Sequence, residues 1–396
     1  MGLTVIEVRD RQALNEFIQL PFRLYHSDPQ WVPPLLSEEK KNFDRRIHPF
    51  LKKNDAAFFL CYRNGKTVGR IAAIINHEHN RHYGEAMGFF GFFESIDDVE
   101  VAHCLFTAAE DWLKLMHMQA IRGPVNYSVN EVAGLLTDGF DEPPFVMMSF
   151  NPPYYQELLR QNGFAIVKRF FAYDVTQQTI RLPFPSTVLE KRLQEEGISI
   201  RSPDLSRAEA EIEIIRNLFN EAWKDNWGFI PMSREEALFA LQQMKSIAKS
   251  DLIFIAENQG TPVGFSLSLP DINQALRPLR GRLFPINWIR LLRGLKKINQ
   301  IRVILMGVLK KYRHKGIDLL FYIKTVENAV RQNYFRAEMS WILEDNIAMN
   351  RVLEHIHARN YRTYALFEKD LYSKPSSRYQ PIVAANASGR ENRGTK

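Results

Sequence analysis

The chain has little cysteine and lacks any long apolar segment. Cys61 and Cys104 are the only cysteines among 396 residues, and they lack the paired spacing of metal sites and disulfide frameworks. No apolar run is long enough to cross a bilayer, and the N-terminus is charged by Glu7 without an apolar core. We therefore expect a reduced, cytoplasmic protein without a signal peptide or membrane span.

Acidic residues are absent from one long stretch. Residues 277–317 contain twelve Lys or Arg and no Asp or Glu, whereas the whole chain has a net charge of +7. The rest of the chain therefore carries a net charge of −5, because the total of +7 includes the twelve positive charges of this stretch. This distribution indicates an anionic ligand or surface at one place rather than a generally basic protein.

The order of predicted elements is repeated. The length exceeds one typical domain. Residues 1–180 predict a strand, a helix, a hairpin at Asn64-Gly65, a strand, a helix, a strand, the irregular stretch 123–150, a helix and a strand. A similar order follows in residues 181–372, interrupted by an insertion at 270–300, and the polar tail 373–396 is expected to be disordered. We predict an α/β fold (an α+β mixed sheet) in two tandem domains.

A basic turn with one glycine follows the predicted strand 301–309. Arg313, His314 and Lys315 precede Gly316, and Ile317 opens a helix. Backbone amides at a helix start, with cations beside them, bind phosphate. The pattern Arg313-x-x-Gly316-x-Asp318 resembles the acyl-CoA pyrophosphate loop of the GNAT acyltransferases, which prefer Gly or Ala where Asp318 stands. The alternative is a capped helix start on a basic surface.

The resemblance implies the rest of an acyl-CoA site. Leu309 continues the strand into the loop, and an amide near Gly307 or Val308 would polarise the thioester oxygen. Asn346 and Asn350, on the predicted helix 347–357, would contact the pantetheine arm, unless Asn346 is only a helix cap. Acidic residues after the strand 88–94 disfavour a diphosphate in the first domain. That domain is expected to shape the substrate pocket, and its candidate lining residues, which also suit plain turns, are Asn126, Ser128, Asn130 and Glu131.

Direct attack of an amine on the thioester requires a base and an acid. We expect Glu344 to be the base, with Asp345 as its rival. The tyrosine that many GNAT proteins carry about seven residues after the Asn is replaced by Leu353. Tyr361 and Tyr364, near the last predicted strand, are therefore the candidate acids. No metal is expected, since the His-rich segment 77–82 has no second cluster of ligands.

The insertion contains an amphipathic, basic segment at residues 277–299. Its apolar residues gather on one helical face, and its Arg and Lys residues on the other. This pattern is typical of a helix on an anionic membrane surface or beside a long acyl chain. A helix packed on its own protein with a solvated basic face is an equal alternative, and contact with nucleic acid is not favoured.

Across residues 1–371 the chain resembles a bacterial group of tandem GNAT proteins similar to the bacterial ceramide synthases. Shared phrases begin at Asp28, Gly88, Arg122 and Ser340. The resemblance implies an N-acyltransferase that moves an acyl group, acetyl or longer, from acyl-CoA to a primary amine such as a sphingoid base, in the cytoplasm or at the inner membrane surface. Two alternatives are a degenerate module that binds CoA or a partner, and a Fem-type transferase that uses aminoacyl-tRNA.

Overall fold

The computed structural model describes residues 2–181 and 184–372. The elements of the first half are β1 (Leu3–Glu7), α1 (Arg11–Leu24), α2 (Leu36–Asn42), α3 (Pro49–Lys53), β2 (Asp55–Arg63), β3 (Lys66–Ile75), α4 (His77–Tyr83), β4 (Met87–Ser95), α5 (Val99–Leu115), β5 (Ala120–Gly123), β6 (Val125–Asn126), β7 (Val132–Ala133), β8 (Leu135–Asp138), α6 (Tyr155–Gln161) and β9 (Ala165–Thr176). Each strand predicted in this half is present.

The second half repeats this order with its own additions. Its elements are α7 (Ser186–Glu195), β10 (Ile198–Arg201), α8 (Ala208–Ala222), α9 (Arg234–Met244), β11 (Ile253–Asn258), β12 (Thr261–Pro270), α10 (Asn273–Leu276), α11 (Asn287–Leu295), β13 (Gln300–Val308), α12 (Ile317–Arg331), β14 (Arg336–Leu343), α13 (Ile347–His355) and β15 (Arg359–Asp370). Helices α10 and α11 occupy the insertion between β12 and β13. No helix within the described ranges is long and apolar enough to cross a bilayer.

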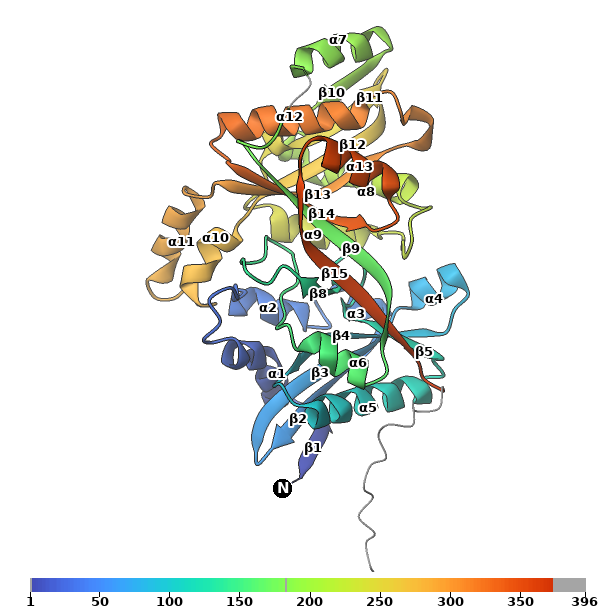
Figure 1. The fold of residues 1–396 in the computed structure, drawn as a ribbon, viewed down its shortest axis with the longest axis vertical. Helices are drawn as coiled ribbons and strands as arrows, with labels where there is room; N and C mark the ends of the chain where they lie inside the picture. Colours follow the sequence, from blue (N-terminus) through green and yellow to red (C-terminus); the bar gives the residue numbers. More distant parts are fainter. Residues whose placement is uncertain (1, 182–183, 373–396) are drawn as a thin grey trace, which may run out of the picture.

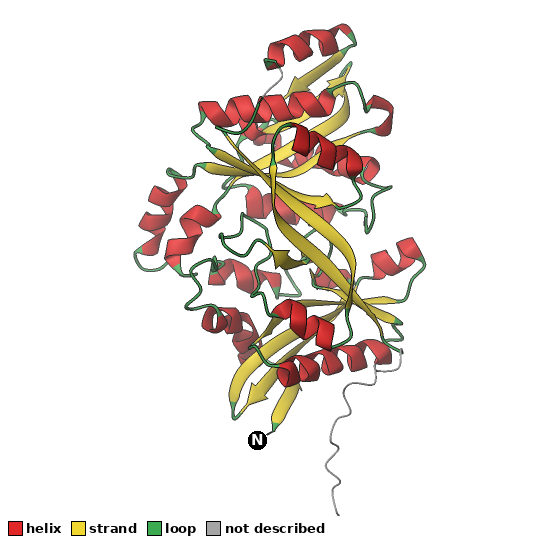
Figure 2. Cartoon of the chain, in the orientation of Figure 1, coloured by secondary structure: helices red, strands yellow, loops and turns green. Residues whose placement is uncertain are grey.

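The strands of both halves form one continuous sheet, with helices packed around it (Figure 2). Its order is β1-β2-β3-β4-β5-β15-β9-β14-β13-β12-β11-β10, with β8 also paired to β15, and β6 and β7 form a separate pair. The pairs β4–β5 and β13–β14 are parallel, one in each half. The neighbouring hairpins are antiparallel. The predicted mixed α/β architecture is confirmed.

The last strand of each half crosses to the other half. β15 pairs with β5 through Phe367 and Gly123, and β9 pairs with β14 through Thr176 and Arg336. β9 and β15 also pair with each other and run together through the middle of the molecule (Figure 1). The two halves therefore meet along shared strands. The predicted domain boundary near residue 180 lies between β9 and α7 and stays a prediction.

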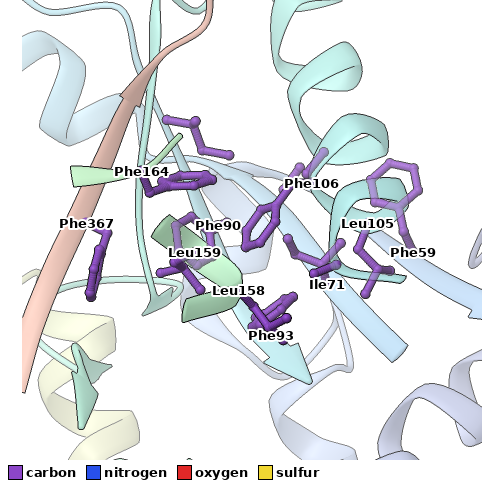
Figure 3. Packing of buried hydrophobic residues seen from close by; sticks show 14 of the residues in the cluster. Phe59, Ile71, Phe90, Phe93, Leu105, Phe106, Leu158, Leu159, Phe164 and Phe367 are labelled. Carbon is purple, nitrogen blue, oxygen red and sulfur yellow. The ribbon is translucent and has the colours of Figure 1, made fainter. Parts of the chain in front are cut away.

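One hydrophobic core of the first half lies between the sheet and helices α5 and α6, and a second contains residues of α1 and α3. Phe93 of β4 stacks on Phe106 of α5 with ring centroids 4.8 Å apart, and Leu158 of α6 joins the same cluster (Figure 3). A Cβ added at Gly91 would lie 2.1 Å from the carbonyl oxygen of Val125. The glycine between the paired phenylalanines of β4 therefore lets β6 approach the sheet closely.

Several helices were not predicted. Residues 77–82, expected to be a polar connection, form α4, which Asn76 caps through the backbone N–H of His79 at 3.0 Å. Helix α7 begins directly after Pro185, at the end of a segment interpreted as a connector, and Leu189 and Leu193 bury it against α12. The stretch 123–150 contains three short strands. The tail 373–396, predicted to be disordered, lies outside the described residues.

Candidate active site

Two parallel strands of the second half separate and open a cavity. β13 and β14 pair only from Gln300 and Arg336 to Val303 and Met339, although both strands continue further. A β-bulge lies at this point of β13, because Val303 and Leu305 pair with consecutive residues of β12 and leave Ile304 between them. The cavity beside these strands has a volume of about 270 Å³.

Apolar side chains dominate the cavity wall. The aromatic residues Phe219, Trp223, Trp227 and Phe229 line it together with strand residues of β13 and β14. Six of the eleven methionines of the chain also line it, namely Met147, Met232, Met244, Met306, Met339 and Met349. Methionine adapts to irregular apolar shapes. The wall therefore suits a flexible hydrocarbon chain better than a compact polar molecule.

The first half contributes polar groups to the same cavity. Asn130 and Glu131, predicted to line a substrate pocket, both line this cavity. Asn130 also donates a hydrogen bond to the Ile230 carbonyl at 3.1 Å, which links the two halves. The other two predicted residues have structural roles: Asn126 accepts a hydrogen bond from the Phe92 N–H at 2.8 Å, and Ser128 accepts one from the Asn130 N–H at 3.2 Å.

Glu131 has a carboxylate that is suited to accepting a proton. Its side chain is 35% exposed and lies 3.5 Å from the buried ring of His48. Burial raises the pKa of the Glu131 carboxyl, although the neighbouring His48 opposes the rise. The His48 ring packs against the rings of Tyr127 and Phe239, with both centroids 4.7 Å away. A fixed carboxylate with a raised pKa in an apolar cavity has the properties of a general base.

The predicted pyrophosphate loop forms a turn with open backbone amides. Gly316 has a φ of 95° and caps α12 without any side-chain hydrogen bond to the helix amides. The first N–H groups of an α-helix have no partner within the helix, so those after Gly316 are available to an anion. A 3₁₀ turn at Lys310–Tyr312 precedes this turn. The backbone of the predicted loop is therefore open at the helix start, and phosphate binding there stays a prediction.

The cations of this loop are partly engaged elsewhere. Arg313 donates hydrogen bonds to the carbonyls of Val308 and Ala222, at 3.2 and 2.9 Å, and so ties the loop to α8. Lys315 forms an ion pair with Glu196 at 2.5 Å. His314 is exposed. Arg313 and Lys315, predicted to lie beside the amides, therefore make other interactions in this structure, and their role in binding phosphate stays a prediction.

The corresponding helix start in the first half is already occupied. Asp98 caps α5 by accepting hydrogen bonds from the N–H groups of Glu100 and Val101, at 2.9 and 3.2 Å. Arg63 forms an ion pair with Asp98 at 2.8 Å. A carboxylate thus fills the place where a phosphate would bind, whereas α12 has no such cap. This difference agrees with the prediction of a single CoA site.

The strand residues predicted to polarise the thioester lie outside the cavity wall. Gly307 and Val308 pair with Phe265 and Gly264 of β12, and the Leu309 N–H donates to the Val263 carbonyl at 2.9 Å. The part of β13 that lines the cavity runs from Arg302 to Met306. The irregular backbone that faces the cavity is therefore the bulge at Ile304, three residues before Gly307.

The two asparagines of α13 have different surroundings. Asn346 lines the cavity and also caps the helix, accepting from the Met349 N–H at 3.2 Å. Asn350 is buried, donates to the carbonyls of Leu343 and Glu344 at 3.1 and 3.2 Å, and accepts from the Tyr173 hydroxyl. The structure therefore brings Asn346 to the cavity but not Asn350.

Replacing Asn350 by Ala is expected to lower the free energy of unfolding by about 1–3 kcal/mol, because it leaves buried backbone and hydroxyl groups without partners. Asn346→Ala removes only a cap and is expected to lower it by about 1 kcal/mol. Chemical denaturation of both variants measures the difference. Equal losses would contradict a purely structural role for Asn350.

The predicted acid and bases do not line the cavity. Glu344 accepts from the Arg169 N–H at 3.2 Å, and its carboxylate lies 3.7 Å from the Arg169 guanidinium. Asp345 pairs with Lys168 at 2.5 Å, and the hydrogen bond from Lys168 lowers the pKa of Asp345. Tyr364 is fully buried in a cluster with Leu136, Phe145, Met148 and Ala172. Their catalytic roles stay predictions without support from these surroundings.

A buried polar network at the base of the separated strands was missed. Arg302 of β13 and Glu338 of β14 are both buried and lie 3.5 Å apart, and Ser340 donates to Glu338 at 2.7 Å. The Arg302 guanidinium also lies 5.4 Å from the ring centroid of Trp341 in the cavity wall. In the sequence, the signal for this network was one charged residue within each of two apolar strands.

Among the described residues, no cluster of three or more acidic, His or Cys side chains could hold a metal.

Sequence comparison links this geometry to known proteins. The chain is 35% identical over 376 residues to the bacterial ceramide synthase of Caulobacter vibrioides (strain NA1000 / CB15N), covering 93% of this chain and 98% of that protein. It is 36% identical over 371 residues to Protein YghO of Escherichia coli (strain K12), covering 91% and 94%. No profile of a known protein family matches the chain.

The fold comparison gives a tandem GNAT protein. A tandem GNAT protein from the clavulanic acid biosynthesis pathway superposes with a TM-score of 0.57 at 10% identity, covering 95% of this chain and all of that one. At such low identity this likeness concerns the fold alone. Together with the identity over nearly the whole chain, it shows that the protein is an acyltransferase of the tandem GNAT type and belongs to the family that includes the bacterial ceramide synthase.

Proposed function

We propose that the protein transfers a long-chain acyl group from acyl-CoA to the amino group of a lipid amine, such as a sphingoid base. The methionine-rich cavity beside the separated strands β13 and β14 carries this proposal, since a small acetyl group needs no such wall. The name of the Caulobacter relative supports it, because a ceramide is an N-acylated sphingoid base.

The donor binds with its pyrophosphate at the start of α12. The open amides after Gly316 and the exposed Lys310 and Lys311 offer partners for the phosphates. Asp318 lies in the first helical turn and reduces the attraction for an anion, but it is not the cap of the helix. The acyl chain then extends into the cavity past Asn346.

The reaction is a direct transfer. The amine nitrogen attacks the thioester carbon, a C–N bond forms, the C–S bond breaks, and CoA leaves as a thiolate. The substrate ammonium must lose a proton before its nitrogen can attack, and we assign this proton to the Glu131 carboxylate, in place of Glu344 and Asp345, because Glu131 lines the cavity and burial raises its pKa. We assign polarisation of the thioester oxygen to the backbone at the Ile304 bulge.

The departing thiolate requires a proton donor. Tyr322 of α12 lines the cavity, and its hydroxyl lies 2.8 Å from the Met349 sulfur. Burial raises the pKa of Tyr322, which keeps its hydroxyl protonated. We assign proton return to Tyr322 in place of Tyr364, which is fully buried and does not line the cavity.

Filling the cavity is expected to change the preferred acyl chain. Ala240 of α9 lines the cavity, and Ala240→Trp adds a large ring there. We expect kcat/KM for palmitoyl-CoA to fall at least about ten-fold, while kcat/KM for butyryl-CoA stays within about two-fold, because the short chain leaves the rest of the cavity unused. Steady-state release of CoA with each donor and one lipid amine measures both values.

The matched control is Ala248→Trp, at a partly buried alanine of the same region that does not line the cavity. It is expected to leave the ratio of the two kcat/KM values unchanged. An unchanged ratio in Ala240→Trp would show that the cavity does not hold the acyl chain.

A further inference from the structure

The hairpin of α10 and α11 exposes a cluster of large apolar side chains. Phe284, Ile286, Trp288 and Leu292 are 86%, 63%, 51% and 53% exposed. They lie within nine consecutive residues, on an insertion that projects from the side of the molecule (Figure 1). Single exposed apolar residues are normal on a protein surface, but a cluster of this kind marks a contact surface.

Exposed cations lie close to this cluster in the sequence. Residues 277–299 contribute seven exposed cations, namely Arg277, Arg280, Arg282, Arg290, Arg293, Lys296 and Lys297, and contain no acidic residue. None of the seven forms an ion pair with any residue of the described ranges. The positive charge is thus available to an external anionic partner.

The hairpin is fixed to the body of the protein by its inner side. The Leu36 N–H donates to the Gly281 carbonyl at 3.1 Å, and a Cβ at Gly281 would lie 2.4 Å from the Phe22 ring. Within the hairpin, the backbone of α11 at Gly294 packs on Ala275 of α10. A Cβ added at Gly294 would lie 2.9 Å from the Ala275 Cβ. Because the inner side is occupied, the exposed apolar side chains cannot bury themselves by a simple rotation of α11.

We propose that this outer side, formed by Phe284, Ile286, Trp288 and Leu292 with the seven cations of residues 277–299, docks on the surface of an anionic phospholipid bilayer. Aromatic and aliphatic side chains enter the boundary between headgroups and acyl chains, and flanking Lys and Arg bind anionic headgroups. A protein partner would leave the dense positive charge unexplained, and RNA would leave the aliphatic cluster unexplained. The docking goes beyond acyl transfer, since it concerns where the protein works.

Vesicle flotation tests this proposal with the full chain. We expect binding to vesicles of phosphatidylcholine mixed with phosphatidylglycerol, and at least about ten-fold weaker binding to phosphatidylcholine alone. The double variant Trp288→Glu/Leu292→Glu is expected to lose at least about ten-fold in partition coefficient. The triple variant Arg290→Gln/Arg293→Gln/Lys297→Gln is expected to lose about 100-fold, since each cation near the surface contributes about five-fold.

A matched control is Leu115→Glu, which changes another highly exposed leucine at the end of α5. It is expected to bind vesicles like the unchanged protein, and the melting temperatures of all variants report folding. Equal binding to both vesicle types, no binding to either, or unchanged binding of the Trp288→Glu/Leu292→Glu variant overturns the proposal. Binding of a homopolymeric RNA in preference to anionic vesicles also overturns it. No turnover is needed, so the outcome is independent of the proposed reaction.

Discussion

Replacing Glu131 by Gln lowers kcat of acyl transfer by about 100- to 10,000-fold, the range expected for loss of a general base. The substitution keeps the size of the side chain and removes its ability to take a proton. Glu131 lines the cavity of the second half although it comes from the first half. The affinity for acyl-CoA is expected to stay within about two-fold, because the donor binds at α12. Single-turnover measurements separate the chemical step from binding.

The pH dependence gives this prediction a second readout. A base must be deprotonated to act, so kcat/KM rises with pH through the pKa of Glu131 in the free enzyme. Burial raises the pKa of that carboxyl, so the acidic limb is expected above the ordinary range of glutamate. Glu131→Gln is expected to remove the limb from the residual activity.

Glu344→Gln is the matched control, because Glu344 is the base expected from sequence and is held by Arg169 outside the cavity wall. It is expected to change kcat by no more than a few-fold. If Glu344→Gln loses activity by 100-fold or more while Glu131→Gln does not, the assignment of the base to the first half is wrong.

Replacing Gly316 by Val abolishes tight acyl-CoA binding. Gly316 has a φ of 95°, which valine cannot adopt without strain, so the turn and the first amides of α12 must move. Loss of two charge-assisted hydrogen bonds to the pyrophosphate, each contributing about 1.5–3 kcal/mol, raises Kd at least about 100-fold. Isothermal titration with palmitoyl-CoA measures the change.

Gly260→Val separates backbone strain from ligand binding. Gly260 also has a positive φ, 79°, but it lies in the β11–β12 turn with open space around it. Both variants are expected to lose stability, and only Gly316→Val is expected to lose affinity. Unchanged affinity in Gly316→Val would place the pyrophosphate elsewhere.

Much of the fold could be predicted because its signals are local. The hairpin at Asn64-Gly65 and the apolar strands of the first half were visible as short patterns, and all are present. The exchange of β9 and β15 between the halves could not be predicted, because strand pairing depends on contacts far apart in the chain. Helix α7 was missed because its short apolar face is buried by contact with α12, which lies far away in the sequence.

The candidate site divides in the same way. The glycine turn before α12 was predicted from residues adjacent in sequence, and its φ and open amides agree with that reading. Glu131 was identified only as a turn residue that could line a pocket, whereas Glu344 was favoured as the base. Which carboxylate faces the cavity depends on the meeting of the two halves, and a neighbouring Arg169 engages Glu344. No pattern within one half contains that information.

Identification of the product by mass spectrometry tests the central claim most directly. The protein is incubated with an equal mixture of acetyl-CoA and palmitoyl-CoA and with sphinganine as the amine, and the amides formed are identified by mass. We predict N-palmitoyl sphinganine as the main product, with release of an equal amount of CoA. We predict that Glu131→Gln forms this product only at the low rate that remains after loss of the general base. Formation of N-acetyl sphinganine in equal or greater amount, or CoA release without any amide, would contradict long-chain acyl transfer to a lipid amine.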